Sequence, residues 1–288
     1  MRDLFANTSA HWGRYSEYEW KTAPDGNCYL LPTGKAKPSV YDPMKNLHTL
    51  VIDALEIGLM LFRHAPEAKM KQAIRAFAGQ YGLLGIMTAL PTTAEFIEYE
   101  KVYLPKNPFL RNEVMETQEY LRLFFPFVHP DFQKKGVESV WETEDKYEIA
   151  FAMTFQSEPQ AMVMSFMRNY GERYDWLCKL FKDWAFLALT PTFYMEEKKR
   201  DDPDTLALYR KGIAAFEGNA PTYHIELRDK PTLVWNFHSL LLDIRFLLST
   251  MLTDEHIPLR MCRHCYKPFI ASAPDEEYCS QACKEDSK

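Results

Sequence analysis

Four cysteines near the C-terminus are the residues of this chain whose type and spacing best fit a defined chemistry. Two residues separate Cys262 from Cys265, three separate Cys279 from Cys283, and thirteen lie between the two pairs. Zinc is bound tetrahedrally, so four thiolates supplied as two close pairs meet its needs. The two-residue gap suits a tight turn, and the three-residue gap places both sulfurs on one face of a helix. We therefore predict a zinc site with these four ligands.

The predicted zinc is structural, because four thiolates leave no coordination position open for a substrate. The residues between the cysteine pairs can form a small hairpin, in which Phe269 and Tyr278 are expected to cover the metal. A knuckle, a hairpin and a helix in this order predict a small treble-clef-like zinc finger over residues 258–288. The alternative is a set of free or disulfide-bonded cysteines, which the pairing of the motifs disfavours.

The expected compartment is the cytoplasm. Clustered cysteines in a cytosolic protein are usually metal ligands, because disulfides are rare there. Residues 1–20 mix charged and aromatic side chains and lack the apolar stretch of a secretory signal. The most apolar stretches, 57–62 and 83–90, fall well short of the roughly 18 to 20 residues that cross a bilayer. We therefore expect no membrane contact.

The composition predicts a globular, mainly α fold with a few short strands and a β-hairpin, in addition to the finger. Hydrophobic residues make up 47% of the 288, which is ample for a core, and charged residues make up 26%, which argues against disorder. Glycine is scarce, and the prolines fall mostly between apolar stretches. This distribution favours helices joined by proline-marked loops.

Periodicity predicts three segments: an irregular N-terminal arm over residues 1–41, a mainly helical domain over 42–257 and the finger over 258–288. Asp42 and Pro43 have the types expected of an N-cap and a first helical residue. Apolar residues at steps of three and four predict helices at 42–64, from Pro66 onward, at 109–125, at 158–189 and at 237–252. Alternation predicts short strands at 96–104 and 146–155 and a hairpin at 223–235.

Three glycines at steps of three, Gly79, Gly82 and Gly85, follow the helix that starts at Pro66. A phosphate-binding loop needs a preceding strand and a different spacing. We therefore expect either a close helix crossing or a break where the helix ends.

Other candidate chemistry is weak. The sequence contains no zincin motif, P-loop, nucleophile elbow or dinucleotide-binding fingerprint. His238 and Asp243 lie five apart on a predicted helix and do not share a face. Cys28 or Cys178 would need a partner histidine to act as a nucleophile, and Cys178 is expected to be buried in an apolar helix. We predict no enzymatic activity and no catalytic or cofactor-binding residue other than the zinc ligands.

A resemblance to known proteins is confined to the last quarter of the chain. The segments LRMCRHCYKPF (259–269) and YCSQAC (278–283) resemble the C-terminal zinc finger of an uncharacterised bacterial family common in Firmicutes, and residues 222–257 are similar to it as well. More loosely, the chain is similar to the CGNR zinc-finger proteins, which pair a helical domain with such a finger and are regarded as transcription regulators. The resemblance implies a regulator whose finger contacts nucleic acid.

The charge of the chain points away from nucleic acid. The formal net charge is −6, whereas binding to phosphates generally requires a basic surplus. Residues 260–288 contain five basic and five acidic side chains. We expect a macromolecular partner, either nucleic acid or protein. The rival hypotheses are a purely structural zinc module and, less favoured, an enzyme with a pocket among the helices.

Overall fold

The fold is mixed α/β, and the prediction of a mainly α protein is wrong. The computed structural model describes residues 8–86, 100–103, 109–110, 114–127, 168–197, 202–214, 216, 218, 220–255, 258–273 and 275–287. Of these residues, 47% are helical and 22% lie in strands, and the described part of the chain forms 12 strands in five small sheets. The strands are two to six residues long, and most are too short for alternation to identify them in the sequence.

Most residues between Thr8 and Tyr41 belong to strands. These strands are β1 (Thr8–Ala10), β2 (Trp12–Tyr15), β3 (Tyr18–Thr22), β4 (Cys28–Pro32) and β5 (Pro38–Tyr41). β2 pairs with β5 and β3 pairs with β4, both antiparallel. β4 also pairs with β8 (Glu172–Arg173), and β1 runs parallel to β10 (Pro231–Asn236), the second strand of a hairpin with β9 (Thr222–Leu227). The predicted hairpin at 223–235 is confirmed.

The helices begin largely where the capping residues predict. They are η1 (Pro43–Asn46), α2 (Leu47–Phe62), α3 (Glu67–Tyr81), α4 (Thr117–Phe124), α9 (Tyr174–Glu197), α10 (Pro203–Ala214), α11 (Leu240–Thr253) and α12 (Gln281–Asp286). The Asp42 carboxylate accepts the backbone N–H of Met44, as expected of an N-cap. None of the described helices is long and apolar enough to cross a membrane.

Two predicted elements differ from the structure, and others lie outside the described residues. The helix predicted at 109–125 is reduced to α4, because strand β7 (Val114–Glu116) occupies the residues before it and pairs with β6 (Lys101–Tyr103). In the helix predicted at 158–189, residues 158–167 are not described, and α9 starts after them. The strand predicted at 146–155, and residues 96–99 of the one predicted at 96–104, also lie outside the described part.

The glycine series marks a helix end rather than a phosphate loop. Gly82 is the C-cap of α3, and both Gly82 and Gly85 have positive φ angles. The turn that follows is held by Glu172, whose buried carboxylate accepts the backbone N–H groups of residues 84, 85 and 86 at 2.7 to 3.0 Å. Trp12 packs against the same glycines and donates its indole N–H to the carbonyl of Leu83. The turn thereby joins the N-terminal strands to the helices.

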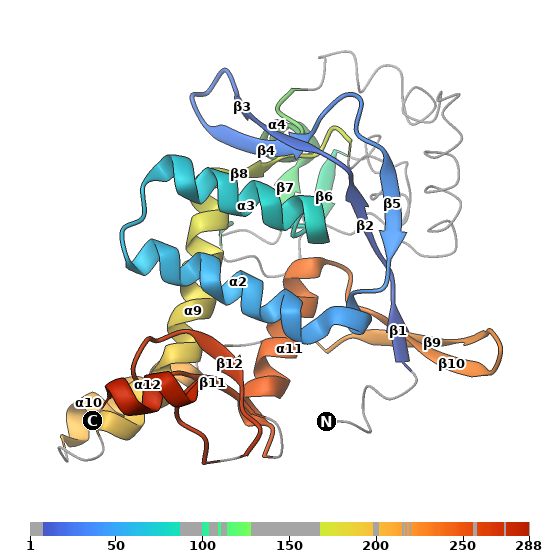
Figure 1. Cartoon of the computed structure of the whole chain (residues 1–288). Helices are drawn as coiled ribbons and strands as arrows, with labels where there is room; N and C mark the ends of the chain where they lie inside the picture. The colour runs from blue at the N-terminus through green and yellow to red at the C-terminus, as the bar shows by residue number, and fades with distance from the viewer. Residues whose placement is uncertain are drawn as a thin grey trace.

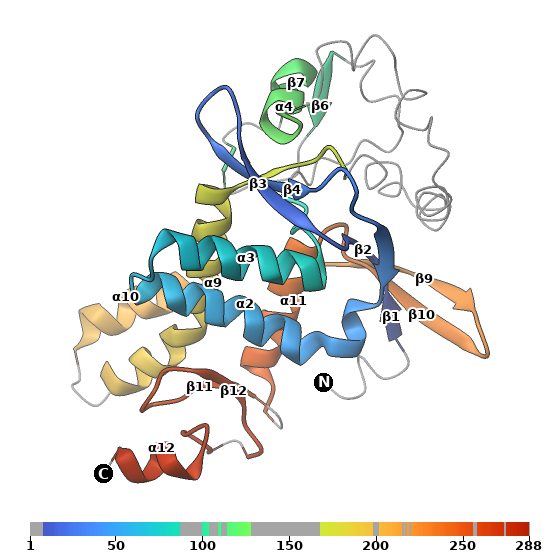
Figure 2. The ribbon, with the colours of Figure 1, turned by 45° about the horizontal axis from the view of Figure 1, so that its top comes forward.

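Helices α2, α9 and α11 form the centre of the molecule, and the final hairpin, formed by β11 (Leu259–Met261) and β12 (Pro268–Ile270), lies against this group (Figure 1). α2 approaches α9 at Gly58, where an added Cβ would lie 2.5 Å from the Cβ of Ala185 and closer still to the carbonyl of Phe181. One buried cluster includes side chains from all three predicted segments, from Ala10 to Met261. Figure 2 shows α3 and α2 stacked in front of α9 and α11.

The crossing at Gly58 gives a stability prediction. Gly58→Ala should destabilise the fold by about 1 to 3 kcal/mol or more, since the backbone of α9 cannot yield to a methyl group. Gly79→Ala is the matched control, because a Cβ there meets nothing within 4 Å. It should stabilise α3 by up to about 1 kcal/mol. Denaturant unfolding of both variants measures the difference, and equal effects would contradict the close crossing.

Candidate metal centre

The C-terminal segment is built from a short hairpin and a short helix that carry the four cysteines. Strand β11 (Leu259–Met261) pairs antiparallel with β12 (Pro268–Ile270), and Cys262 directly follows β11. The knuckle is closed by two backbone hydrogen bonds of 2.9 Å, from the N–H of Cys262 to Lys267 and from the N–H of Tyr266 to Cys262. This tight turn brings Cys265 back over Cys262.

The second pair is placed by α12. Cys279 precedes the helix, and Cys283 lies within its first turn. Ser280 is the N-cap, and its hydroxyl accepts the backbone N–H of Cys283 at 3.2 Å. Because the cap fixes the start of the helix, it also fixes the direction in which Cys283 points.

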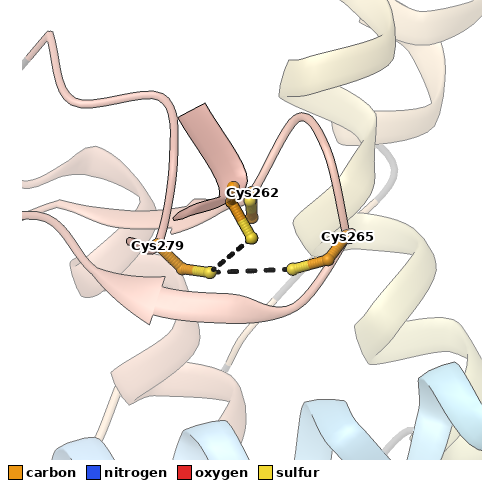
Figure 3. Close-up of side chains that lie close together, drawn as sticks. Cys262, Cys265 and Cys279 are labelled. Carbon is orange, nitrogen blue, oxygen red and sulfur yellow. Dashed lines mark hydrogen bonds between the residues drawn. The ribbon is translucent and has the colours of Figure 1, made fainter. Parts of the chain in front are cut away.

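The sulfurs of Cys262, Cys265 and Cys279 point toward one another (Figure 3), and the sulfur of Cys283 lies close to all three. All lie within 4.8 Å of one another, and Cys279 is 3.6 Å from both Cys265 and Cys283. All six cysteines of the chain are free of disulfide bonds. A tetrahedral ion with metal–sulfur bonds of about 2.3 Å requires sulfurs about 3.8 Å apart, so the arrangement fits a bound metal ion. Within the described ranges, these four residues are the only group that could hold a metal.

The protein environment shifts the pKa values of two of the four thiols in opposite directions. Burial raises the pKa of Cys262, but backbone N–H groups of Cys265, Cys279 and His264 outweigh this effect and lower the pKa to about 6. Burial and the neighbouring thiols raise the pKa of Cys279 to about 12. Binding of a metal cation would therefore release protons, since thiolates are the form that binds.

The inner side of this segment is part of the protein core. Leu259, Met261 and Cys262 are buried. Arg63, the residue after α2, donates from its guanidinium to the carbonyl of Cys265 at 2.9 Å. A helix far away in sequence thus holds the knuckle that carries two of the four sulfurs.

The outer side carries paired and mixed charges. Arg263 forms an ion pair with Glu277 at 2.7 Å and also donates its backbone N–H to the carbonyl of that residue. A surface hollow beside α12 is lined by Asp275, Glu276, Glu277 and Lys284, among others. Phe269 and Tyr278 are partly buried, and their predicted contact with the metal stays a prediction.

The other sequence candidates do not assemble into a second site. His238 lies before α11 with a φ of 64°, and Asp243 lies within the helix. Cys28 and Cys178 are both partly exposed, so Cys178 is less buried than expected. Burial raises the pKa of the Cys178 thiol, which disfavours a reactive thiolate.

Asp243, which the sequence offered only as a poorly placed partner of His238, is a buried acid. No described group forms a hydrogen bond with either carboxylate oxygen. Burial, and to a lesser extent the nearby Asp42, raise its pKa well above the ordinary value. The sequence does hold a sign of this burial. Asp243 lies within the apolar stretch LLLDIRFLL (240–248), and a stretch this apolar is unusual on a face exposed to solvent.

Comparison with known proteins adds no family. A scan against protein-family models found no match, and searches of curated proteins and of solved structures found none either. The similarity to bacterial zinc-finger families therefore remains a prediction from the sequence.

Asp243 gives a prediction for stability against pH. Its pKa is higher in the folded than in the unfolded protein, so its ionisation weakens folding as the pH rises from about 4. Asp243→Asn cannot ionise. The difference in unfolding free energy between this variant and the wild type should therefore shift in favour of the variant by on the order of 1 to 3 kcal/mol from pH 4 to pH 7.

Urea unfolding at both pH values measures this gain. Asp183→Asn is the control, since Asp183 is exposed and pairs with Lys179 on the surface of α9. A gain that is equal at pH 4 and pH 7 would show that Asp243 is not neutral in the folded protein.

Proposed function

We propose that the four cysteines bind one structural Zn²⁺ in a treble-clef-like finger, and that this ion fastens the C-terminal segment to the helical body of a cytoplasmic protein. Thiolate sets select zinc among the common divalent cations, and four of them exclude water and substrate from the metal. Cys262, Cys265, Cys279 and Cys283 would be the ligands. We assign no catalytic role to the ion.

The observation that carries the proposal is the hydrogen bond from Arg63 to the carbonyl of Cys265. The knuckle has to be ordered for this carbonyl to face Arg63, and the metal would order the knuckle. Buried Leu259 and Met261 place the adjoining strand in the main core. Loss of the metal should therefore be felt at the end of α2 as well as in the finger.

The free energy of zinc binding is large enough for the ion to stabilise the fold. Structural zinc contributes on the order of 10 kcal/mol or more to small modules that cannot fold alone. The net stability of a whole domain is only about 5 to 15 kcal/mol. A site of this strength can decide whether the C-terminal residues are folded.

Zinc content and hydrogen exchange test both parts of the proposal. Reduced, purified protein should contain one zinc per chain by elemental analysis, and Cys283→Ser should lose it together with several degrees of melting temperature. Cys178→Ser is the control, because that thiol lies outside the cluster. Chelation should speed amide exchange in 258–287 and in the last turn of α2.

These experiments test the zinc site and the attachment of the C-terminal segment to α2 separately. Protein without stoichiometric metal would remove the zinc site. Zinc-loaded protein in which chelation affects only residues 258–287 would keep the site but remove the fastening of the finger to α2.

A regulatory role through nucleic acid is the second candidate, and it rests on the similarity of the finger to CGNR proteins. The surface of the C-terminal segment does not favour binding to the phosphates of nucleic acid. Arg263 is already paired with Glu277, and α12 places Glu285 and Asp286 beside Lys284. A protein partner suits this mixed surface better.

We therefore expect no shift of random DNA or RNA by the zinc-loaded protein in a mobility assay at low salt. A complex that weakens steeply as salt rises would instead support the nucleic-acid regulator, because such dependence reports phosphate contacts.

A further inference from the structure

The β9–β10 hairpin presents an apolar face to solvent. Tyr223, Ile225 and Leu227 are 63, 71 and 84% exposed, and they alternate along one face of β9. Their cross-strand neighbours Leu233 and Trp235 continue this face on β10. Figures 1 and 2 both show the hairpin projecting away from the helical body. Three large exposed apolar side chains in a row are uncommon on a strand that faces only water.

Among the strands that the structure describes, none pairs with the outer edge of β9. The sheet order is β1-β10-β9, and no described strand lies beyond β9. Pro231 faces Leu227 and has no N–H, so this is a non-hydrogen-bonded pair of the ladder. Such pairs alternate with bonded ones, so Tyr223 and Ile225 belong to the same class. The N–H and C=O groups of these β9 residues therefore point outward, away from β10.

We propose that a second copy of this chain pairs antiparallel with the outer edge of β9, on a two-fold axis at Ile225. In this register Ile225 faces the partner's Ile225, and Tyr223 faces the partner's Leu227. The outward N–H and C=O groups of each strand then meet those of the other in bonded pairs. His224 faces the partner's Glu226 on the opposite side of the joined sheet.

Charge selects the partner and the register. A shift by one step in one direction would set Glu226 against the partner's Glu226 and His224 against the partner's Arg228. The opposite shift would set His224 against the partner's His224. Like charges directly opposite each other destabilise a sheet, whereas opposite charges stabilise it. Within each strand Glu226 bonds His224 and Arg228, and the axis at Ile225 keeps the two Glu226 carboxylates of a dimer from facing each other. Of these three registers it alone sets His224 opposite a carboxylate and avoids identical polar side chains in opposition, in the arrangement that a closed symmetric dimer needs.

The contact is small, so the dimer should depend on concentration. One strand on each side forms a narrower interface than the standard class of stable complexes. The matched charges give specificity, and the apolar face gives affinity. Association is expected within the range of concentrations that sedimentation can cover.

Sedimentation velocity of the full chain over a concentration series tests the pairing. The wild type should shift from monomer to dimer. Ile225→Pro removes an outward N–H but no ladder bond to β10, and it should weaken the dimer at least tenfold. Leu208→Ser is the control: Leu208 is 68% exposed on α10, and its loss should change nothing.

A charge exchange tests the register without proline. His224→Glu places two carboxylates in opposition and should weaken the dimer, whereas the double variant His224→Glu/Glu226→His should restore it. A wild type that stays monomeric throughout, a dimer that survives Ile225→Pro, or a double variant that does not recover would each overturn the proposal.

Discussion

The close crossing of α2 and α9 is the constraint on which the position of the finger depends. Gly58 lets the backbones approach, and a side chain at this position would overlap the carbonyl of Phe181. α2 continues from this crossing to Arg63, which holds the carbonyl of Cys265, while β11 packs against α9 and α11. The distance between two helices therefore determines where the cysteine knuckle sits.

The N-terminal strands depend on a different contact, between Glu172 and the turn after α3. Three backbone N–H groups and the hydroxyl of Tyr170 bond its carboxylate. Burial nevertheless raises its pKa, so the desolvation of the carboxylate exceeds what these bonds return. The carboxylate stabilises the fold by a different route. The backbone N–H groups of the turn have no partner in a strand or helix, and leaving buried N–H groups without a partner costs free energy, which Glu172 avoids by accepting them. The buried carboxylate of Glu172 therefore allows the backbone of this turn to be buried in the core.

The sequence was informative where the signal is local. The cysteine pairs, the Asp42 cap and the apolar stripe of α11 each depend on residues within a few positions of one another, and the structure contains all three. The β9–β10 hairpin, whose strands are adjacent in the sequence, was predicted, whereas the pairing of β4 with β8 and of β1 with β10 was not, because it joins residues more than a hundred positions apart. The burial of Asp243 and Glu172 was not predicted, because the position of an acid in the sequence does not show whether the folded protein will exclude water from it.

Helix α11 connects the two surfaces that could meet other molecules. Midway along it, Phe246 packs against Trp235 and Phe237, so the helix supports the root of the β9–β10 hairpin. The same helix contacts β11, the strand that leads into Cys262. The backbone N–H of Leu241 also bonds the carbonyl of Leu84, in the turn that Glu172 holds. Because well-packed cores transmit strain rather than absorb it, α11 is one route by which a change at the hairpin reaches the C-terminal segment, besides the contacts of that segment with α2 and α9.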